Sequence, residues 1–415
     1  MALSAATAVR PIYLDHHATT PCDPRVIAAM LPTFGDDFGN AASRQHAFGT
    51  AAAGLVERAR EQTAALLYAD PREIIFTSGA TESNNLALKG AAERASAGRR
   101  HIVTTTIEHR AVLDPCARLE RAGFRVSYVP VGSDGVLRVE DLAAALAPDT
   151  FLVSVMLANN EIGTLQPIVE LGALCKERGI LLHSDAAQAL AYVECDVEEL
   201  GVDLLSISAH KMYGPKGAGA LWIRRRRPHV RIAPLFDGGG HERGQRSGTI
   251  NVPGVVGLGA ACELVGRERD VERDRVRALR DRLHARITTG LDGVDVNGSL
   301  ERRLPNNLNL AFAGVSSDAI LRCLDGVAVS SGAACSSASD DGSYVLRSLG
   351  GDRAARGSLR FGLGRFTTAA EIERAADLVI AAVRRARSLP AASPGAGDEP
   401  GCEAPRARPG GGLKA

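Results

Sequence analysis

The sequence lacks the features of several large functional classes. Its 49 Lys+Arg residues and 48 Asp+Glu residues give a net charge of +1, so no positive field draws nucleic acid to it. No apolar stretch approaches the roughly 18 residues of a membrane helix, and residues 1–9 lack the pattern of a secretory signal. The eight cysteines include no Cys-x-x-Cys pair, which argues against a zinc site, a redox pair and a disulfide framework. We therefore expect a reduced, cytoplasmic protein with no direct nucleic-acid or membrane partner.

The sequence does contain the pattern of an α/β protein. Of its 415 residues, 45% are hydrophobic and 23% are charged, which suits a large core and about two or three domains. Between residues 73 and 223, short apolar runs alternate with helix-like segments, and such runs are typical of parallel strands covered on both faces. The runs are Ile74–Phe76, Ile102–Thr105, Val126–Val129, Leu152–Met156, Ile180–His183, Leu204–Ile207 and Ala220–Ile223.

The pattern changes near residue 262, which predicts a second unit. A long charged helix is expected over Glu263–Ile287, a strand over Asn307–Phe312 and a further helix over Glu371–Arg387. These elements predict a smaller α+β domain. The predicted divisions are a segment joining the small domain (1–15), a large domain (16–262), the small domain (263–387) and a disordered tail rich in Pro, Gly and Ala (388–415).

Three segments that follow predicted strands carry candidate chemistry. The first, Phe76-Thr-Ser-Gly-Ala-Thr-Glu82, opens a helix with small residues, so its backbone N–H groups can receive an anion and Thr81 can add a hydroxyl. The alternative is a simple capping box that starts at Ser78. The second segment holds Asp185 at a strand end, where it can bind a cationic ring nitrogen or cap the next helix.

The third segment, Ser206-Ile-Ser-Ala-His-Lys-Met-Tyr-Gly-Pro-Lys-Gly217, contains a candidate nucleophile. Lys211 lies among small and aromatic residues, where partial desolvation lowers the pKa of an amine and favours attack on aldehydes. Lys216 competes for this role, but Pro-Lys-Gly is typical of a surface turn. An anion cradle, a carboxylate for a ring nitrogen and an amine for an aldehyde are together the parts of a pyridoxal 5'-phosphate site, and Gln188 lies within reach of the ring hydroxyl.

In these segments and others, the chain resembles the cysteine desulfurases of the NifS/IscS type, which belong to the class V aminotransferase-like enzymes. The resemblance runs from about Tyr13 to Arg387 and implies a fold-type I transferase with a seven-stranded, mostly parallel sheet and a smaller α+β domain. The motifs that carry it are Tyr13-Leu-Asp-His-His-Ala-Thr-Thr-Pro21, Phe38-Gly-Asn-Ala-Ala-Ser-Arg-Gln-His46, Thr77-Ser-Gly-Ala-Thr-Glu-Ser83, Glu108-His-Arg-Ala-Val-Leu113, Asn159-Asn-Glu-Ile-Gly163, Ser208-Ala-His-Lys211, Gly238-Gly-Gly-His-Glu-Arg-Gly-Gln-Arg-Ser-Gly-Thr249, Ser330-Ser-Gly-Ala-Ala-Cys-Ser-Ser337 and Arg360-Phe-Gly-Leu-Gly-Arg365.

The resemblance implies roles for the residues that hold the cofactor. Lys211 matches the lysine that binds the cofactor aldehyde, and Asp185 matches the partner of its ring nitrogen. His109 matches a histidine that stacks on the ring and handles substrate protons. Contacts to the cofactor phosphate are implied for Ala80, Thr81, Ser208, His210 and Thr249.

Other implied roles concern the substrate and the assembly. Asn160 and Gln188 match contacts to the ring face and hydroxyl, and Asn160 also lies toward the substrate. Arg360 matches the clamp on the carboxylate of L-cysteine, a task that suits a guanidinium. Because the family draws the phosphate contact of Thr249 from a partner subunit, the resemblance implies a homodimer.

Cys335 distinguishes a desulfurase from other pyridoxal-phosphate enzymes. It lies in a stretch of small and polar residues that predicts a mobile, exposed loop, and an exposed thiolate is a nucleophile. The resemblance implies that Cys335 attacks the sulfur of bound cysteine, releases alanine and passes the persulfide sulfur to an acceptor such as an iron–sulfur scaffold. A transient role of Cys335 as an iron–sulfur ligand shared with that scaffold stays open.

Two features leave alternatives open. The Pro- and Gly-rich tail lacks the aromatic segment with which housekeeping family members dock the scaffold, so the sulfur acceptor is open. The alternatives to desulfuration are another fold-type I enzyme, such as an aminotransferase or a selenocysteine lyase, and a non-catalytic partner in sulfur relay or cluster assembly.

Overall fold

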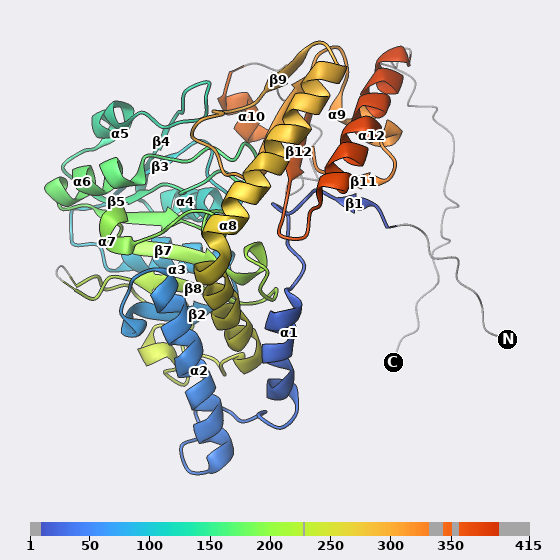
Figure 1. Cartoon of the computed structure of the whole chain (residues 1–415). Helices are drawn as coiled ribbons and strands as arrows, with labels where there is room; N and C mark the ends of the chain where they lie inside the picture. The colour runs from blue at the N-terminus through green and yellow to red at the C-terminus, as the bar shows by residue number, and fades with distance from the viewer. Residues whose placement is uncertain (1–9, 227–228, 332–342, 351–356, 390–415) are drawn as a thin grey trace, which may run out of the picture.

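A computed structural model describes residues 10–226, 229–331, 343–350 and 357–389. The predicted nucleophile, Cys335, and most of the predicted tail lie outside these residues; Ser388, where the tail was expected to begin, is still the last residue of a helix. A central sheet is covered by helices on both faces, and a smaller sheet lies beside it (Figure 1). None of the helices in these ranges is long and apolar enough to cross a membrane.

The central sheet has seven strands in the order β2-β8-β7-β6-β5-β3-β4. Neighbouring strands from β7 to β4 run parallel, and β8 alone is antiparallel to its neighbours. Each predicted apolar run forms one of these strands, which confirms the predicted α/β class. The strands are β2 (Ile74–Thr77), β3 (His101–Thr105), β4 (Arg125–Val129), β5 (Thr150–Ser154), β6 (Leu181–Asp185), β7 (Leu204–Ser208) and β8 (Gly219–Ile223).

Alternate strand residues face two different helical layers. Ile75 and Leu152 pack with α3 (Ala80–Glu93) and α4 (Arg110–Arg121), whereas Ile74 and Val153 pack into the larger core on the opposite face. This second face is covered by α2 (Ala47–Leu66), α6 (Ile168–Arg178), α7 (Val197–Leu200) and α8 (Val252–Gly290). Because both faces are buried, the strands need no polar alternation.

The smaller sheet is formed by residues from the C-terminal part of the chain. Its three antiparallel strands are ordered β12-β10-β9, and a separate parallel pair joins β1 near the N-terminus to β11. The elements of this part are β1 (Ile12–Tyr13), β9 (Val294–Val296), β10 (Asn307–Phe312), α9 (Ser317–Cys323), β11 (Val327–Ala328), α10 (Tyr344–Ser348), β12 (Ser358–Gly362) and α12 (Ala369–Ser388). The division into domains stays a prediction.

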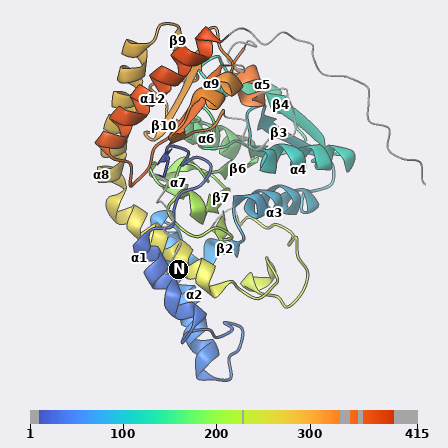
Figure 2. The same ribbon diagram turned by 90° about the vertical axis from the view of Figure 1, so that its right-hand side faces the viewer.

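One helix connects the two parts of the molecule. The helix expected to begin at Glu263 begins at Val252 instead, so α8 passes without interruption through the predicted boundary at 262. The first turns of α8 contain several glycines, so the sequence did not indicate a helix there. These glycines let the helices approach closely, since a Cβ at Gly259 would lie 2.6 Å from Cα of Ala59 in α2. Figures 1 and 2 show α8 with α2 beside its first half and α12 beside its second half.

Several further elements were not assigned from the sequence. Besides α2, they include helices and short 3-10 turns that arrange the segments around the central sheet. They are α1 (Pro24–Met30), α5 (Val139–Ala145), η1 (Leu31–Phe34), η2 (Pro71–Glu73), η3 (Ala209–Lys211) and η4 (Glu242–Gly244).

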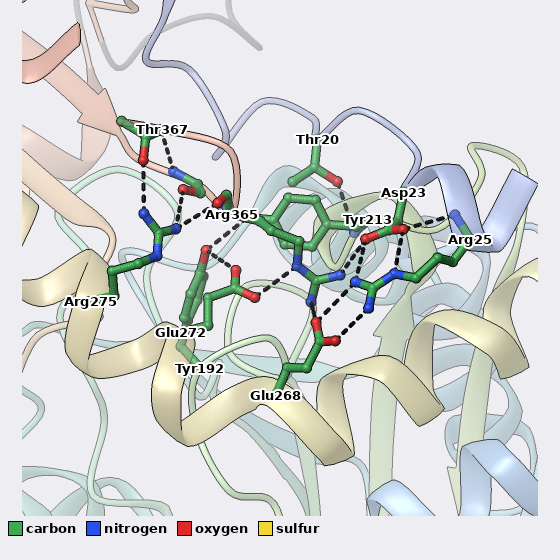
Figure 3. A network of polar contacts seen from close by, with 11 residues as sticks. Thr20, Asp23, Arg25, Tyr192, Tyr213, Glu268, Glu272, Arg275, Arg365 and Thr367 are labelled. Carbon is green, nitrogen blue, oxygen red and sulfur yellow. Dashed lines mark hydrogen bonds and ion pairs between the residues drawn. The ribbon is translucent and has the colours of Figure 1, made fainter. Parts of the chain in front are cut away.

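A buried ionic cluster joins the N-terminal segment, α8 and the segment after β12 (Figure 3). The Arg365 guanidinium lies between two buried carboxylates, with Nη1 2.7 Å from Asp23 Oδ2 and Nε 2.8 Å from Glu272 Oε2. Hydrogen bonds from Arg25, and after them the one from Arg365, hold the pKa of Asp23 well below its usual range. The cluster therefore keeps its charges paired where water is excluded.

Two tyrosines extend this cluster to the turn that contains Lys211. The Arg365 backbone N–H donates to Tyr213 Oη at 2.6 Å, and Tyr213 Oη lies 2.9 Å from Tyr192 Oη. Tyr192 Oη in turn donates to Glu272 Oε1 at 3.4 Å. Tyr213 has a left-handed φ of 65°, a conformation that costs free energy unless surrounding contacts hold it.

Replacing Arg365 is expected to destabilise the fold. Arg365→Met should lower the free energy of unfolding by about 3–5 kcal/mol, because Glu272 would remain buried without its cation and Asp23 would keep only its pair with Arg25. The control is Arg282→Met, whose side chain is 55% exposed in its pair with Glu373 and should cost less than about 1 kcal/mol. Urea unfolding of the full chain measures both, and equal losses would contradict the assigned role of the cluster.

Candidate active site

A cavity of about 650 Å³ lies where the parallel strands end. Residues that follow β2, β6 and β7 line it, as expected for ligand sites at the carboxyl ends of an α/β sheet. Most of the residues singled out from the sequence meet here. Those that line the cavity are Ala80, Thr81, His109, Asn160, Asp185, Gln188, Ser208, His210, Lys211 and Arg360.

Lys211 ends the short 3-10 turn η3 that follows β7. Its Nζ donates to the backbone carbonyl of Ala18 at 3.0 Å and to that of His17. The turn itself is fixed by Thr20, whose Oγ1 donates to His210 O at 3.0 Å and accepts from Tyr213 N at 2.9 Å. Lys216, the competing lysine, lies at the cavity edge in an exposed turn, as its Pro-Lys-Gly setting predicts.

Asp185 lies at the end of β6, and both its carboxylate oxygens have donors. Oδ2 accepts from Asn84 Nδ2 at 2.6 Å, and Oδ1 accepts from the backbone N–H of Ala187 at 2.9 Å. The alternative role as a helix cap is wrong, because a turn follows Asp185 and the next helix begins at Val197. No role was predicted for Asn84, which lies one turn into α3 and just beyond the small-residue segment that ends at Glu82.

The start of α3 provides an anion cradle. The N-cap is Gly79 with a φ of 144°, and no side chain caps the first turn. Ser78 is therefore not the cap that the alternative interpretation expected; its N–H donates to Glu82 Oε2 at 2.8 Å. Ser208 Oγ lies about 4.0 Å from where a Cβ at Gly79 would sit, so backbone and hydroxyl donors converge on one space.

His17 was missed in the sequence, although it lies within the quoted motif at residues 13–21. Its Nδ1 lies 3.0 Å from Gln188 Oε1, while Gln188 Nε2 donates to His17 O at 3.0 Å. The second bond orients the amide, so Nδ1 of His17 is the donor of the first. Burial lowers the pKa of His17 to about 3, which keeps the ring neutral.

Arg360 approaches the cavity from β12 of the smaller sheet. The buried guanidinium donates from Nη2 to Asp15 Oδ1 at 2.8 Å and from Nη1 to the backbone carbonyl of Asn160 at 2.9 Å. Among the described residues, Nε of Arg360 and Oδ1 of Asn160 have no hydrogen-bond partner. These groups are left for a ligand with acceptor and donor atoms, such as an amino acid.

His109 caps α4 at the cavity wall, where its Nδ1 accepts from Ala111 N at 3.0 Å. Its neutral ring therefore carries the remaining proton on Nε2. His210 also lines the cavity, with Nδ1 3.1 Å from Thr19 Oγ1, and burial lowers its pKa to about 4.

Two predicted site residues are not among the described residues that line the main cavity. Within the part of the chain that the structure describes, Thr249 lines a separate cavity of about 250 Å³. This smaller cavity shares Ser78 and Gly217 with the main one. Cys335 falls outside the described residues, as does any iron–sulfur ligation by it.

The cavity fits pyridoxal phosphate on its own chemistry. An uncapped helix start at Gly79 suits the phosphate, and Asp185 suits a protonated ring nitrogen. Lys211 suits the aldehyde, and the buried Asn84 Oδ1 has no partner among the described residues. The donor set and the available volume are therefore both adequate.

Comparisons with known proteins show the family to which the chain is similar. Residues 12–375 match the family described as aminotransferase class-V. The chain is 54% identical over 380 residues to a cysteine desulfurase IscS of Anaeromyxobacter dehalogenans, covering 91% of this chain and 94% of that protein. It is 51% identical to the mouse (Mus musculus) cysteine desulfurase over 386 residues, covering 93% and 84% of the two chains.

Solved structures show the same relationship. A NifS-like protein aligns with a TM-score of 0.83 at 38% identity, covering 89% of this chain and 98% of that one. SspA, solved in complex with cysteine, aligns with a TM-score of 0.77 at 35% identity, covering 86% and 100%.

The buried, neutral His17 predicts a pH dependence of stability. The unfolded chain binds a proton at about pH 6.5 and the folded chain only at about pH 3. Stability should therefore fall as the pH drops between these values, by up to about 1.4 kcal/mol per pH unit. His17→Asn should flatten this slope in urea unfolding at about pH 6 to 4.

The matched control is His229→Asn, at an exposed position, which should leave the slope as in the wild type. A slope that His17→Asn leaves unchanged would show that His17 is not neutral in the folded protein.

Proposed function

The chain belongs to the class-V aminotransferase family and, within it, to the pyridoxal-phosphate-dependent cysteine desulfurases; from this premise we propose which of its residues perform the reaction. Lys211, Asp185 and Arg360 line one cavity, and this convergence carries the proposal. Lys211 would bind the aldehyde of the cofactor and Asp185 its ring nitrogen, whereas Arg360 binds the substrate carboxylate.

Substrate orientation depends on Arg360. A guanidinium binds a carboxylate in a fixed, planar geometry, and Arg360 is itself held by Asp15 and by the Asn160 carbonyl. We expect this arrangement to orient the Cα of L-cysteine toward Lys211, which lines the same cavity. Asn160 contributes its amide, whose Oδ1 is otherwise unpaired among the described residues.

The cofactor, when bound, supplies an electron sink that makes the Cα proton of the substrate acidic. Its phosphate would be held by Ala80, Thr81, Ser208 and His210, and its ring by His109, Gln188 and Asp185. Lys211 Nζ takes the proton from Cα of the substrate. His109, which lies in the same wall, exchanges protons with the sulfur end of the substrate.

Cys335 is the nucleophile in this proposal. Its thiolate forms a bond to the substrate sulfur while the bond from that sulfur to Cβ breaks, and the electron pair stays with carbon, which takes up a proton. L-cysteine and the thiol thus give L-alanine and an enzyme persulfide. Four other cysteines are poor nucleophiles, because burial raises the pKa of their thiols to about 12. They are Cys116, Cys175, Cys195 and Cys262.

The persulfide sulfur then passes to an acceptor protein. We propose an iron–sulfur scaffold in the cytoplasm as this acceptor, with Cys335 as its transient partner in ligation. The relatives named cysteine desulfurase IscS come from bacteria, which supports a cytoplasmic location, whereas a Drosophila melanogaster relative is named as mitochondrial.

A homodimer completes the site. Thr249 lies outside the main cavity of its own chain and is available to the site of a partner. An exposed apolar cluster supports association: Phe34, Phe38 and Phe48 are each more than half exposed, and the rings of the last two lie 5.3 Å apart.

Incubation with L-cysteine is expected to add one sulfur to the peptide that contains Cys335. Lys211→Ala should reduce alanine formation by at least about 10³-fold, because both cofactor attachment and proton removal are lost. Cys335→Ser should abolish the persulfide while the cofactor colour stays. Mass spectrometry of the peptides measures the label, and the control Cys22→Ser changes the only half-exposed thiol among the described cysteines.

Labelling of a different cysteine in the wild type, or a persulfide that survives in Cys335→Ser, would contradict this assignment.

Mixing two inactive variants tests whether Thr249 acts across subunits. In a heterodimer of Lys211→Ala with Thr249→Ala, one site has its own Lys211 and the intact Thr249 of the partner, so activity should recover to about half of the wild-type value per dimer. If Thr249 acts within its own chain, no site in the heterodimer is complete. The mixture should then form alanine no faster than either variant alone. Alanine formation after subunit exchange distinguishes these results.

A further inference from the structure

Glu161 is a buried carboxyl group in the cavity wall for which the proposed reaction gives no role. It lies in the Asn159-Asn-Glu-Ile-Gly163 motif, between β5 and α6, and its side chain is almost fully buried. It lines the same cavity as Lys211, His109 and Arg360. A buried carboxyl group without a salt bridge needs a reason, because ionisation away from water is costly.

The backbone of Glu161 is held rigidly on both sides. Its N–H donates to Asn159 Oδ1 at 2.8 Å, and its carbonyl accepts from Asn307 Nδ2 at 3.2 Å and Asn309 Nδ2 at 3.1 Å. These two asparagines lie on β10, so the smaller sheet fixes the residue against the cavity. Preorganisation of this kind is what a group that transfers protons requires.

One carboxylate oxygen is fixed and the other is not. Oε2 accepts a hydrogen bond from Ser343 Oγ, which also caps α10. Oε1 makes no hydrogen bond within the described part of the chain and is not among its fully enclosed unpaired atoms. The free oxygen is therefore left to face the cavity.

The surroundings of Glu161 bring the pKa of its carboxyl group close to neutral pH. Burial raises its pKa to about 7, and the hydrogen bond from Ser343 opposes this rise. Two arginines and a histidine from different elements also favour the ionised form, namely Arg360 on β12, Arg347 on α10 and His109 before α4, the last through its protonated form. Such a group both accepts and releases protons at physiological pH.

We propose that Glu161 is a further acid–base catalytic residue of the desulfurase reaction. Its carboxylate takes the proton released when a reacting thiol ionises, and its carboxylic acid returns one proton to the carbon that loses sulfur. One proton is gained and one is given up in each turnover, so the group is restored. This inference rests on the proposed desulfurase chemistry of the same cavity.

The experiment compares pH profiles of alanine formation by the holoenzyme. In the wild type, kcat/KM should rise with pH near 7, because the ionised carboxylate is the competent form. Glu161→Gln should lower kcat about 10²-fold and remove this rise. Ser343→Ala should keep the rise but move it to higher pH, since the bond that favours the carboxylate is lost.

The matched control is Glu108→Gln. Glu108 is also buried, and burial raises its pKa to about 8, but it is not among the residues that line the cavity. Glu108→Gln should leave the pH of the rise unchanged. Infrared difference spectra of the cofactor-free proteins give a readout independent of activity: a carboxyl band that titrates near pH 7 should be absent only in Glu161→Gln.

The result that would overturn this inference differs from the result that would contradict the proposed function. A profile that is the same in the wild type and in Glu161→Gln, with alanine still formed, would overturn the inference and leave the proposed function intact. A wild-type holoenzyme that forms no alanine at any pH would instead contradict the proposed function.

Discussion

The site depends on the buried ionic contact between Arg365, Asp23 and Glu272. These residues come from the segment after β12, the N-terminal segment and α8. Through the Arg365 N–H, the same contact holds Tyr213, two residues beyond Lys211. An unpaired charge in this place would be costly, so the segments have one favoured arrangement. The lysine turn and the strand that carries Arg360 are thereby positioned by a single set of charges.

The cavity contains groups whose pKa values are shifted in opposite directions by burial. Burial keeps the histidines at 17 and 210 neutral, whereas it raises the pKa of Glu161 toward neutrality. Both carboxylate oxygens of Asp185 accept hydrogen bonds. One low-dielectric space can therefore contain groups that stay neutral and a group that exchanges protons at the same pH, which suits a reaction that moves protons between nitrogen, carbon and sulfur.

Much of the fold and part of the site follow from local sequence. Runs of apolar residues mark most strands of the central sheet, and Lys211 and Asp185 are recognisable because each lies at or shortly after the end of such a strand. His17, Asn84 and Glu161 escaped notice because their positions depend on contacts with distant segments, for example Glu161 with β10. The start of α8 was missed because glycines that permit close helix packing resemble loop residues. Local patterns do not encode these long-range contacts.

We propose that Lys211 holds the cofactor where these segments meet. Borohydride reduction of the loaded enzyme, followed by peptide mapping, tests it most directly, because reduction makes the bond between lysine and cofactor permanent. We expect the pyridoxyl group on the peptide that contains Lys211. A pyridoxyl group on Lys216 or on another lysine would contradict it.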